Sequence, residues 1–216
     1  MKRLGAALAL ALGLAAAPAF GQVPWTFVPS IMVVSAPDDA RLPLVAEAIE
    51  HWNRQLAEAG AGLRLPAPQW QALPVPEAAL QQMSRTMLQG DPPPQPIPPE
   101  LQSLPGNLVI VLSQGDFVSF ATGFFAGRSK RVVGIRGTSV PPLNLPNVAP
   151  NLIAHEIGHA LGLGHNVDPS LLMCGRPAPC RPPDYRSDTL RMFGLSDAEM
   201  QLLSRLYPPQ FGARPP

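Results

Sequence analysis

Three histidines with the spacing of metal ligands lie in one short run of the chain. The run reads His155-Glu156-Ile157-Gly158-His159-Ala160-Leu161-Gly162-Leu163-Gly164-His165. On a helix, His155 and His159 are one turn apart on the same face, so their imidazoles can share one metal ion. Gly162 ends the helix, because glycine readily takes the left-handed conformation of a tight reversal, and the reversal returns His165 toward the same ion. Three neutral imidazoles with one open position are typical of a catalytic zinc site.

Glu156 follows the first of these ligands and is close enough to hold a water molecule on the metal. Zinc lowers the pKa of its bound water toward neutrality, and Glu156 would accept that proton and pass it to a leaving amine. The chain has four histidines, and three of them are in this run. The fourth, His51, stands beside Trp52 and is interpreted as structural or solvent-facing. The pattern predicts one catalytic Zn²⁺ and the hydrolysis of peptide bonds.

Composition limits the other classes of function. The 216 residues are 46% apolar and 14% charged, with a net charge of +1 and no basic block. A nucleic-acid partner is therefore not expected. The length suits one domain, and 29 prolines predict long irregular stretches.

The first 21 residues have the layout of a secretory signal peptide. Lys2 and Arg3 precede an apolar run at 4–17, and small residues offer cleavage sites after Ala19 or Gly21. The run is shorter than the roughly 20 residues that span a bilayer, so cleavage is favoured over anchoring. We expect a secreted or periplasmic protein, monomeric and without a membrane anchor after cleavage.

Two cysteines, Cys174 and Cys180, are separated by five residues. An exported chain meets an oxidising compartment, so a disulfide between them is the favoured interpretation, with two free thiols as the alternative.

Hydrophobic periodicity and turn residues predict the elements that must position the histidines. Strands are expected at 25–34, 63–65, 107–113, 117–125 and 131–136, and helices at 43–59, from about 151, and at 197–207 after a capping box of Ser196 and Glu199. Residues 66–105 hold 11 of the 29 prolines and are expected to form a surface excursion with one short helix at 77–89. That segment is either a solvated loop or a substrate-guiding arm, and residues 209–216 form a flexible tail.

The histidine run and its flanks resemble the matrixin branch of the metzincin metallopeptidases. The likeness extends from 151–154 before the run to 166–173 after it, and 193–208 resembles the closing helix of matrixin catalytic domains. Met173 lies where metzincins place a methionine turn beneath the zinc. The resemblance implies an α+β, metzincin-type zincin fold in which a twisted mixed β-sheet carries an early helix, a zinc-binding active-site helix and a C-terminal helix. Residues 22–208 would be the catalytic domain.

Two departures from the family bear on its other metals and its latency. Matrixins usually hold a structural zinc and calcium ions upstream of the catalytic helix, but residues 100–150 contain no His and only Glu100 and Asp116 as carboxylates. We therefore expect neither a second zinc nor a strong calcium site. No cysteine precedes the zinc motif, so latency through a propeptide cysteine is not expected.

A peptide substrate is expected to lie extended along an exposed strand edge at 119–125, where Ala121 is the candidate substrate-binding residue. Residues 174–186 would wall the specificity pocket, and Tyr185 either lines it or packs in the core. Two alternatives remain, namely a zinc-binding interaction module and a zinc amidase acting on another amide such as a cell-wall peptide. The presence of Glu156 argues against the module, because a site without catalysis needs no base.

Overall fold

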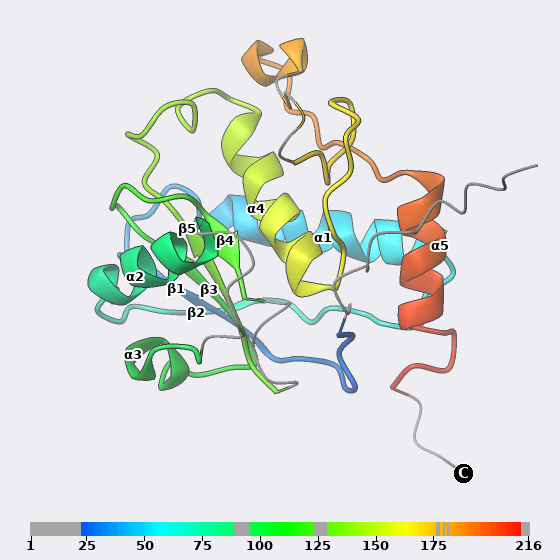
Figure 1. The fold of residues 1–216 in the computed structure, drawn as a ribbon, viewed down its shortest axis with the longest axis horizontal. Helices are drawn as coiled ribbons and strands as arrows, with labels where there is room; N and C mark the ends of the chain where they lie inside the picture. Colours follow the sequence, from blue (N-terminus) through cyan, green and yellow to red (C-terminus); the bar gives the residue numbers. More distant parts are fainter. Residues whose placement is uncertain are drawn as a thin grey trace, which may run out of the picture.

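The computed structural model describes residues 23–88, 96–122, 129–175, 178, 180 and 182–212; the predicted signal peptide lies outside them. The elements, in chain order, are β1 (Ile31–Val34), α1 (Leu42–Glu58), β2 (Gln69–Gln71), α2 (Glu77–Leu88), α3 (Pro99–Gln102), β3 (Leu108–Leu112), β4 (Phe120–Ala121), β5 (Arg131–Ile135), α4 (Val148–Ala160), the 3₁₀ helix η1 (Pro183–Arg186) and α5 (Asp197–Leu206) (Figure 1). Within these residues, no helix is long and apolar enough to cross a membrane.

A five-stranded sheet in the order β2-β1-β3-β5-β4 forms the centre of the molecule. Strands β2, β1, β3 and β5 are parallel, and β4 pairs antiparallel with β5. Strands β3 and β5 are buried along their whole length, as strands covered on both faces must be. The predicted mixed sheet with an early helix, a histidine-bearing helix and a C-terminal helix is confirmed.

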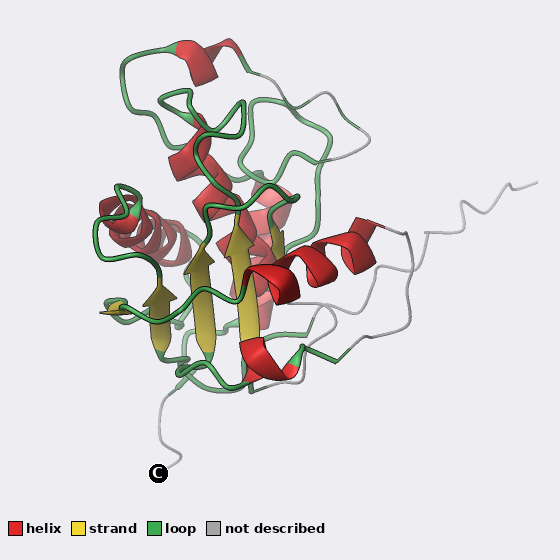
Figure 2. Ribbon diagram, turned by 90° about the vertical axis from the view of Figure 1, so that its left-hand side faces the viewer, coloured by secondary structure: helices red, strands yellow, loops and turns green. Residues whose placement is uncertain are grey.

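Helices cover both faces of the sheet (Figure 2). Successive side chains of a strand point to opposite faces. Accordingly, Ile110 of β3 packs into the core shared with α1 and α4, whereas Val109 and Val111 pack against α2 and α3. The face with α1 and α4 is the one that carries the histidines.

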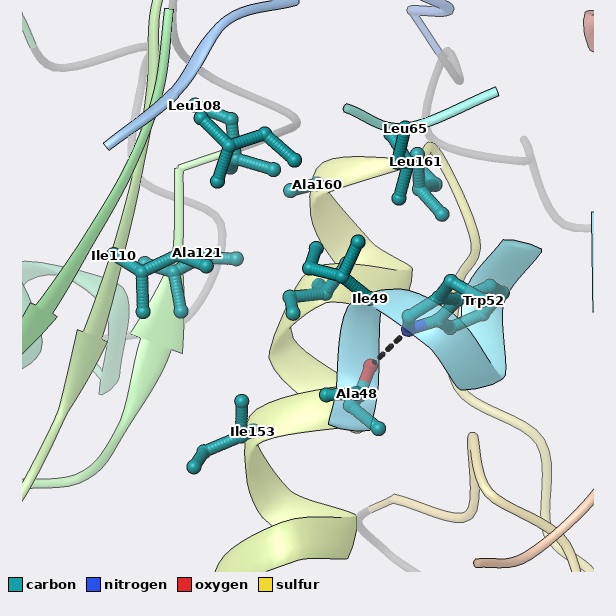
Figure 3. Packing of buried hydrophobic residues seen from close by; sticks show 14 of the residues in the cluster. Ala48, Ile49, Trp52, Leu65, Leu108, Ile110, Ala121, Ile153, Ala160 and Leu161 are labelled. Carbon is teal, nitrogen blue, oxygen red and sulfur yellow. Dashed lines mark hydrogen bonds between the residues drawn. The ribbon is translucent and has the colours of Figure 1, made fainter. Parts of the chain in front are cut away.

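Helix α1 fixes the position of α4 (Figure 3). Its apolar stripe, including Ala48, Ile49 and Trp52, is buried against α4. The indole N–H of Trp52 donates a 2.8 Å hydrogen bond to the carbonyl of Ala154, directly before the first histidine of the run. Because this indole is buried, the bond satisfies its only donor and locks the two helices in register.

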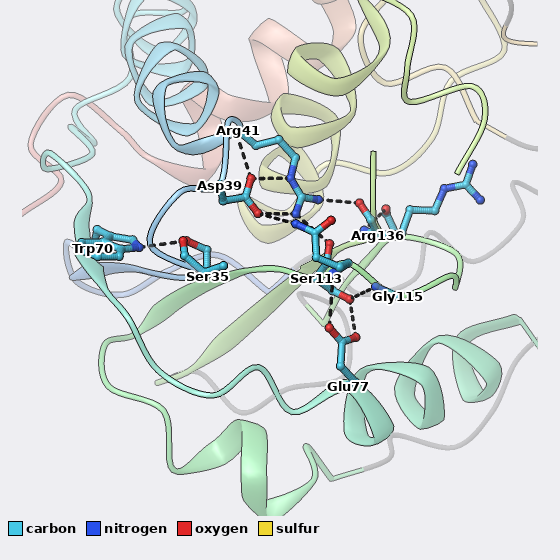
Figure 4. A network of polar contacts seen from close by, with 11 residues as sticks. Ser35, Asp39, Arg41, Trp70, Glu77, Ser113, Gly115 and Arg136 are labelled. Atoms are coloured by element: carbon cyan, nitrogen blue, oxygen red, sulfur yellow. Dashed lines mark hydrogen bonds and ion pairs between the residues drawn. The ribbon is translucent and has the colours of Figure 1, made fainter. Parts of the chain in front are cut away.

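A buried ion pair ties the start of α1 to the sheet (Figure 4). Asp39 and Arg41 pair at 2.6 Å with side chains only 2% exposed. Arg41 also donates to the carbonyls of Ser113 (2.7 Å) and Arg136 (2.6 Å), which follow β3 and β5. One guanidinium therefore holds together the carboxyl ends of two strands and the entry to α1.

The proline-rich segment 66–105 differs from the expected surface excursion. Its described part contains β2, α2 and α3, and it buries Leu80, Met83 and Leu101 against the sheet. The short helix expected at 77–89 is present as α2. Most of the Pro-rich run at 91–99 lies outside the described residues, which resume at 96.

Other boundaries also differ from the sequence-based expectation. Residues 63–65 form no strand, although Leu63 and Leu65 are buried, since their apolar character serves the core without pairing. Strand 117–125 shortens to β4, and 123–125 lie outside the described residues. Helix α4 begins at Val148 instead of about 151, because Pro150 is tolerated in a first turn. In the expected tail, Phe211 packs edge-to-face on Tyr207 at 5.1 Å.

Candidate metal centre

Helix α4 and the reversal after it bring the three histidines together. His155 and His159 lie one turn apart on α4. Gly162 then has φ +99°, a conformation that glycine adopts without steric cost, and the N–H of Leu163 donates to the carbonyl of Gly158 at 3.0 Å. This turn redirects the chain so that His165 faces the other two rings.

The three Nε2 atoms form a nearly equilateral triangle. They are 3.1 Å apart for His155 and His159, 2.9 Å for His159 and His165, and 3.3 Å for His155 and His165. Tetrahedral zinc with Zn–N bonds of roughly 2.0–2.1 Å places its nitrogen ligands about 3.3 Å apart. The triangle therefore matches the size of one zinc ion.

Main-chain carbonyls determine which nitrogen faces the centre of this triangle. Nδ1 of His155 lies 2.8 Å from the carbonyl oxygen of Leu172, and Nδ1 of His159 lies 2.8 Å from that of Leu163. A carbonyl only accepts, so the proton of each neutral ring is on Nδ1. The Nε2 lone pairs then converge on one point, which favours a cation there, and such carbonyl contacts are the usual means of orienting metal-binding histidines.

Burial keeps these rings neutral and ready to bind a metal. Desolvation lowers the pKa of His155 to about 4 and the pKa of His159 well below its ordinary value. Metal ligation requires the unprotonated imidazole. Near neutral pH, both rings on α4 are therefore in the form that a metal needs without first losing a proton.

Glu156 is buried beside the first ligand. Desolvation raises the pKa of its carboxyl to about 8 when no cation is nearby. A divalent ion close to a carboxyl favours the charged form and lowers that pKa. Metal binding would therefore convert Glu156 into a carboxylate in a water-poor environment, which is the form that a general base requires.

Met173 packs directly beneath the histidine helix. Its side chain is fully buried, and a Cβ at Gly158 would collide with Met173 Sδ and with the ring of Trp52. The main chain of Asn166 pairs with the same region, its N–H donating to the carbonyl of Met173 at 2.8 Å. The residue expected in a methionine turn thus supports both α4 and the strand-like segment after His165.

The expected disulfide between Cys174 and Cys180 is present, with the two Cα atoms 5.7 Å apart. It closes a loop that begins immediately after Met173. Gly175 in this loop was not singled out from the sequence. A Cβ there would collide with the imidazole of His165, so the chain passes directly against the ring of the third histidine.

A brace at the carboxyl end of α4 was also missed from the sequence. Arg131 of β5 donates to the carbonyls of Ala160 and, at 2.6 Å, of Val23. The hydroxyl of Tyr207 donates to the carbonyl of Leu161 at 2.7 Å. The last carbonyls of a helix have no partner within the helix, and here two side chains from distant elements satisfy them just before Gly162. No spacing rule could connect these residues before the fold was known.

The two candidate substrate-binding residues have different environments. The side chain of Ala121 is buried, but β4 is the edge strand of the described sheet and contacts α4. The N–H of Thr122 donates to Val132, so the alternation of an antiparallel pair directs the N–H and C=O of Ala121 to the open edge. Tyr185 lies on η1 and packs against Phe193 at 5.5 Å, which favours its packing role.

Comparisons with known proteins give a distant fold likeness. No family model matches the chain, and no curated protein matches it. Archaemetzincin from Methanopyrus kandleri is 19% identical, with 82% of this chain and 95% of that chain covered and a TM-score of 0.43. Metalloproteinase-II from Bacteroides fragilis is 13% identical, with coverage of 86% and 54% and a TM-score of 0.47.

A structure described as a chaperone–substrate complex is also similar. It is 14% identical, with coverage of 86% of this chain and 36% of that chain, and a TM-score of 0.44. Because all three TM-scores are below 0.5, the function of this chain must be inferred from its own geometry.

Proposed function

We propose that this chain is a zinc-dependent endopeptidase of the metzincin type, close to the matrixin branch, and that it acts after export. The observation that carries the proposal is the convergence of three Nε2 atoms, two of which belong to rings that carbonyl groups orient and burial keeps neutral. Structural zinc sites close all four positions with protein ligands, whereas three imidazoles leave one position for water or substrate. Within the described residues, these three histidines are the cluster that could hold a metal ion.

The catalytic roles follow from the two kinds of side chain at the site. Zinc bound by His155, His159 and His165 supplies Lewis-acid chemistry, which activates water and polarises a carbonyl. Glu156 takes the proton of the attacking water and delivers it to the nitrogen of the leaving amine. A buried carboxyl is suited to both steps, because its pKa changes strongly with the charge nearby.

The substrate is an extended peptide that pairs with the open edge of β4. The main-chain N–H and C=O of Ala121 point away from β5, where a further strand would pair, and main-chain pairing gives affinity without demanding a particular sequence. The segment after Met173 then forms the wall that selects side chains. Cleavage inside a chain, as opposed to removal of terminal residues, is favoured because an edge strand accepts a peptide that extends in both directions.

Replacing Glu156 by Gln tests the proposed base. The amide has nearly the same volume but cannot accept a proton from water, so hydrolysis of a casein or peptide library should fall by about 100-fold or more. Zinc content, measured by elemental analysis, should stay at one ion per chain. Undiminished hydrolysis in the variant would rule out Glu156 as the base.

The same assay separates the remaining alternatives. A wild-type chain that binds zinc and cleaves no peptide would favour the interaction module. Cleavage of cell-wall peptides, with proteins left intact, would favour the amidase. A chelator should abolish the activity in either hydrolytic case.

A further inference from the structure

Four side chains at one-turn spacing form a continuous stripe along the histidine helix. They are Asn147, at the start of α4, then Asn151, His155 and His159. Each uses a side-chain nitrogen to hold a main-chain carbonyl of a neighbouring segment. The two imidazoles belong to the metal centre, whereas the two amides have no part in the proposed hydrolysis by Glu156 and the three histidines.

Asn147 holds the main chain around η1 at several points. Its amide nitrogen faces the carbonyls of Asp184, Ser187 and Thr189 at 2.8, 3.0 and 2.9 Å. Its amide oxygen accepts the N–H of Arg191 at 2.7 Å. The side chain is fully buried, so no water replaces these partners.

Asn151 continues the same contact one turn later. Its nitrogen donates to the carbonyl of Arg191 at 2.7 Å, and its oxygen accepts the N–H of Phe193 at 2.8 Å. This side chain is 2% exposed. Four contacts from Asn147 and two from Asn151 therefore bind the segment 184–193, which contains no regular structure beyond the single turn of η1.

The amide contacts are linked to the metal ligands through the main chain. The N–H of Leu172 donates to the carbonyl of Gly194 at 2.8 Å, and the carbonyl of the same Leu172 accepts from Nδ1 of His155. The segment held by the two asparagines thus ends beside the acceptor that orients the first histidine. Its position along α4 is fixed relative to the metal centre.

We propose that Asn147 and Asn151 are positioning residues for substrate selection, which hold residues 184–193 in one register against the zinc-binding helix. This inference rests on the proposed peptidase function, because the register of 184–193, which overlaps the proposed pocket wall at 184–186, matters only if a substrate side chain meets that wall. The hydrogen bonds of the two side-chain amides go to main-chain groups and not to the histidine rings, so we expect them to act on the choice of substrate and to leave metal binding unchanged.

The test uses Asn151→Leu and the milder Asn147→Ser in the full exported chain. The first substitution removes both the amide donor and the oxygen acceptor at nearly unchanged size, and the second keeps one short donor. Asn53→Leu is the matched control, because Asn53 of α1 likewise donates to and accepts from the main chain of Leu65, away from the histidines.

Hydrogen exchange and cleavage selectivity are the two readouts. The amide protons of Arg191 and Phe193 should exchange about tenfold faster in the variants at 151 and 147, since their acceptors are weakened or lost. The preference among peptides that differ in one side chain should fall by about tenfold, while zinc affinity stays unchanged. The Asn53 variant should match the wild type in both exchange at these sites and selectivity.

The contrary results distinguish failure of the positioning role from failure of the proposed peptidase function. Unchanged exchange at Arg191 and Phe193, unchanged selectivity despite faster exchange, or weakened zinc binding would each overturn the positioning role. A wild-type chain that holds zinc but hydrolyses no peptide would instead overturn the proposed function.

Discussion

The third histidine depends on two glycines for its position. Gly162 supplies the positive φ that turns the chain back, and Gly175 leaves room for the imidazole of His165. The other two rings are held by a rigid helix, whereas His165 is exposed and follows it in a turn. Accurate placement of the ring thus relies on the segment that passes over it.

Gly175→Ala should weaken zinc binding by about 10- to 100-fold, the effect typical of disturbing the support of a metal ligand. The added methyl group would displace the ring of His165 and break the triangle of Nε2 atoms. Competition with a fluorescent chelator measures the affinity. Gly194→Ala is the control, because a Cβ there meets nothing within 4 Å and should leave the affinity unchanged. Equal affinities in the two variants would contradict the proposed contact.

At the scale of elements, α2 supports the edge strand beside the histidine helix. The hydroxyl of Ser84 donates to the carbonyl of Val118 at 2.8 Å and accepts its N–H at 3.0 Å. This side chain therefore satisfies the main chain of the segment that leads into β4. Leu80 of α2 lies near Gly134, where a Cβ would also meet the ring of Phe120. Through α2, the proline-rich segment 66–105 therefore supports β4, the strand with which the substrate is proposed to pair.

Ser84→Ala should raise KM severalfold with a smaller change in kcat, because a loosened edge binds substrate less well while the metal centre stays intact. The main-chain N–H and C=O of Val118 would lose a part-buried partner, so the free energy of unfolding should fall by about 1 kcal/mol. Steady-state kinetics and urea unfolding measure the two effects. Thr86→Ala is the control on the same helix, since its hydroxyl donates to the carbonyl of Gln82 within α2. A change confined to kcat would refute the supporting role.

The local sequence was enough to predict some helices and strands but not others. The capping box at the start of α5 was predicted, and Ser196 and Glu199 bond to each other's main-chain N–H. By contrast, β2 is exposed, short and flanked by prolines, so its pairing with β1 depends on tertiary contacts that periodicity cannot reveal. The histidine cluster was predictable because one helix and one glycine turn form it. The asparagine and Arg131 contacts were not, because they join segments distant in sequence.

At the scale of the whole molecule, the pair of Asp39 and Arg41 joins the carboxyl ends of β3 and β5 to the start of α1. Burial alone would raise the pKa of Asp39, but the hydrogen bonds and the charge of Arg41 outweigh it, so the pKa lies below its ordinary value of 3.8. An acid with a lowered pKa in the folded state stabilises the fold above its unfolded pKa. That contribution is lost as the pH falls through the folded value.

Asp39→Asn should therefore lower the free energy of unfolding at pH 7 by about 3 kcal/mol, because it leaves the Arg41 charge buried without its counter-ion. The difference from the wild type should shrink as the pH falls below 3.8, where the wild type also loses the ion pair. Urea unfolding of both proteins from pH 7 to below pH 3.8 measures this difference in the free energy of unfolding. Asp116→Asn removes an exposed carboxylate that lies 3.9 Å from Arg136, and it should change the free energy of unfolding little at any pH. A constant difference down to the lowest pH would argue against the assignment.

The brace at the end of α4 has a consequence for the order of events during translation. The N–H of Trp25 meets the hydroxyl of Tyr207, and these residues are 182 positions apart. At about 5–20 residues per second, a ribosome needs roughly 10 to 40 s to travel between them. A nascent chain that already contains all three histidines still lacks Tyr207, so the contacts of its hydroxyl with Trp25 and with the end of α4 cannot yet form.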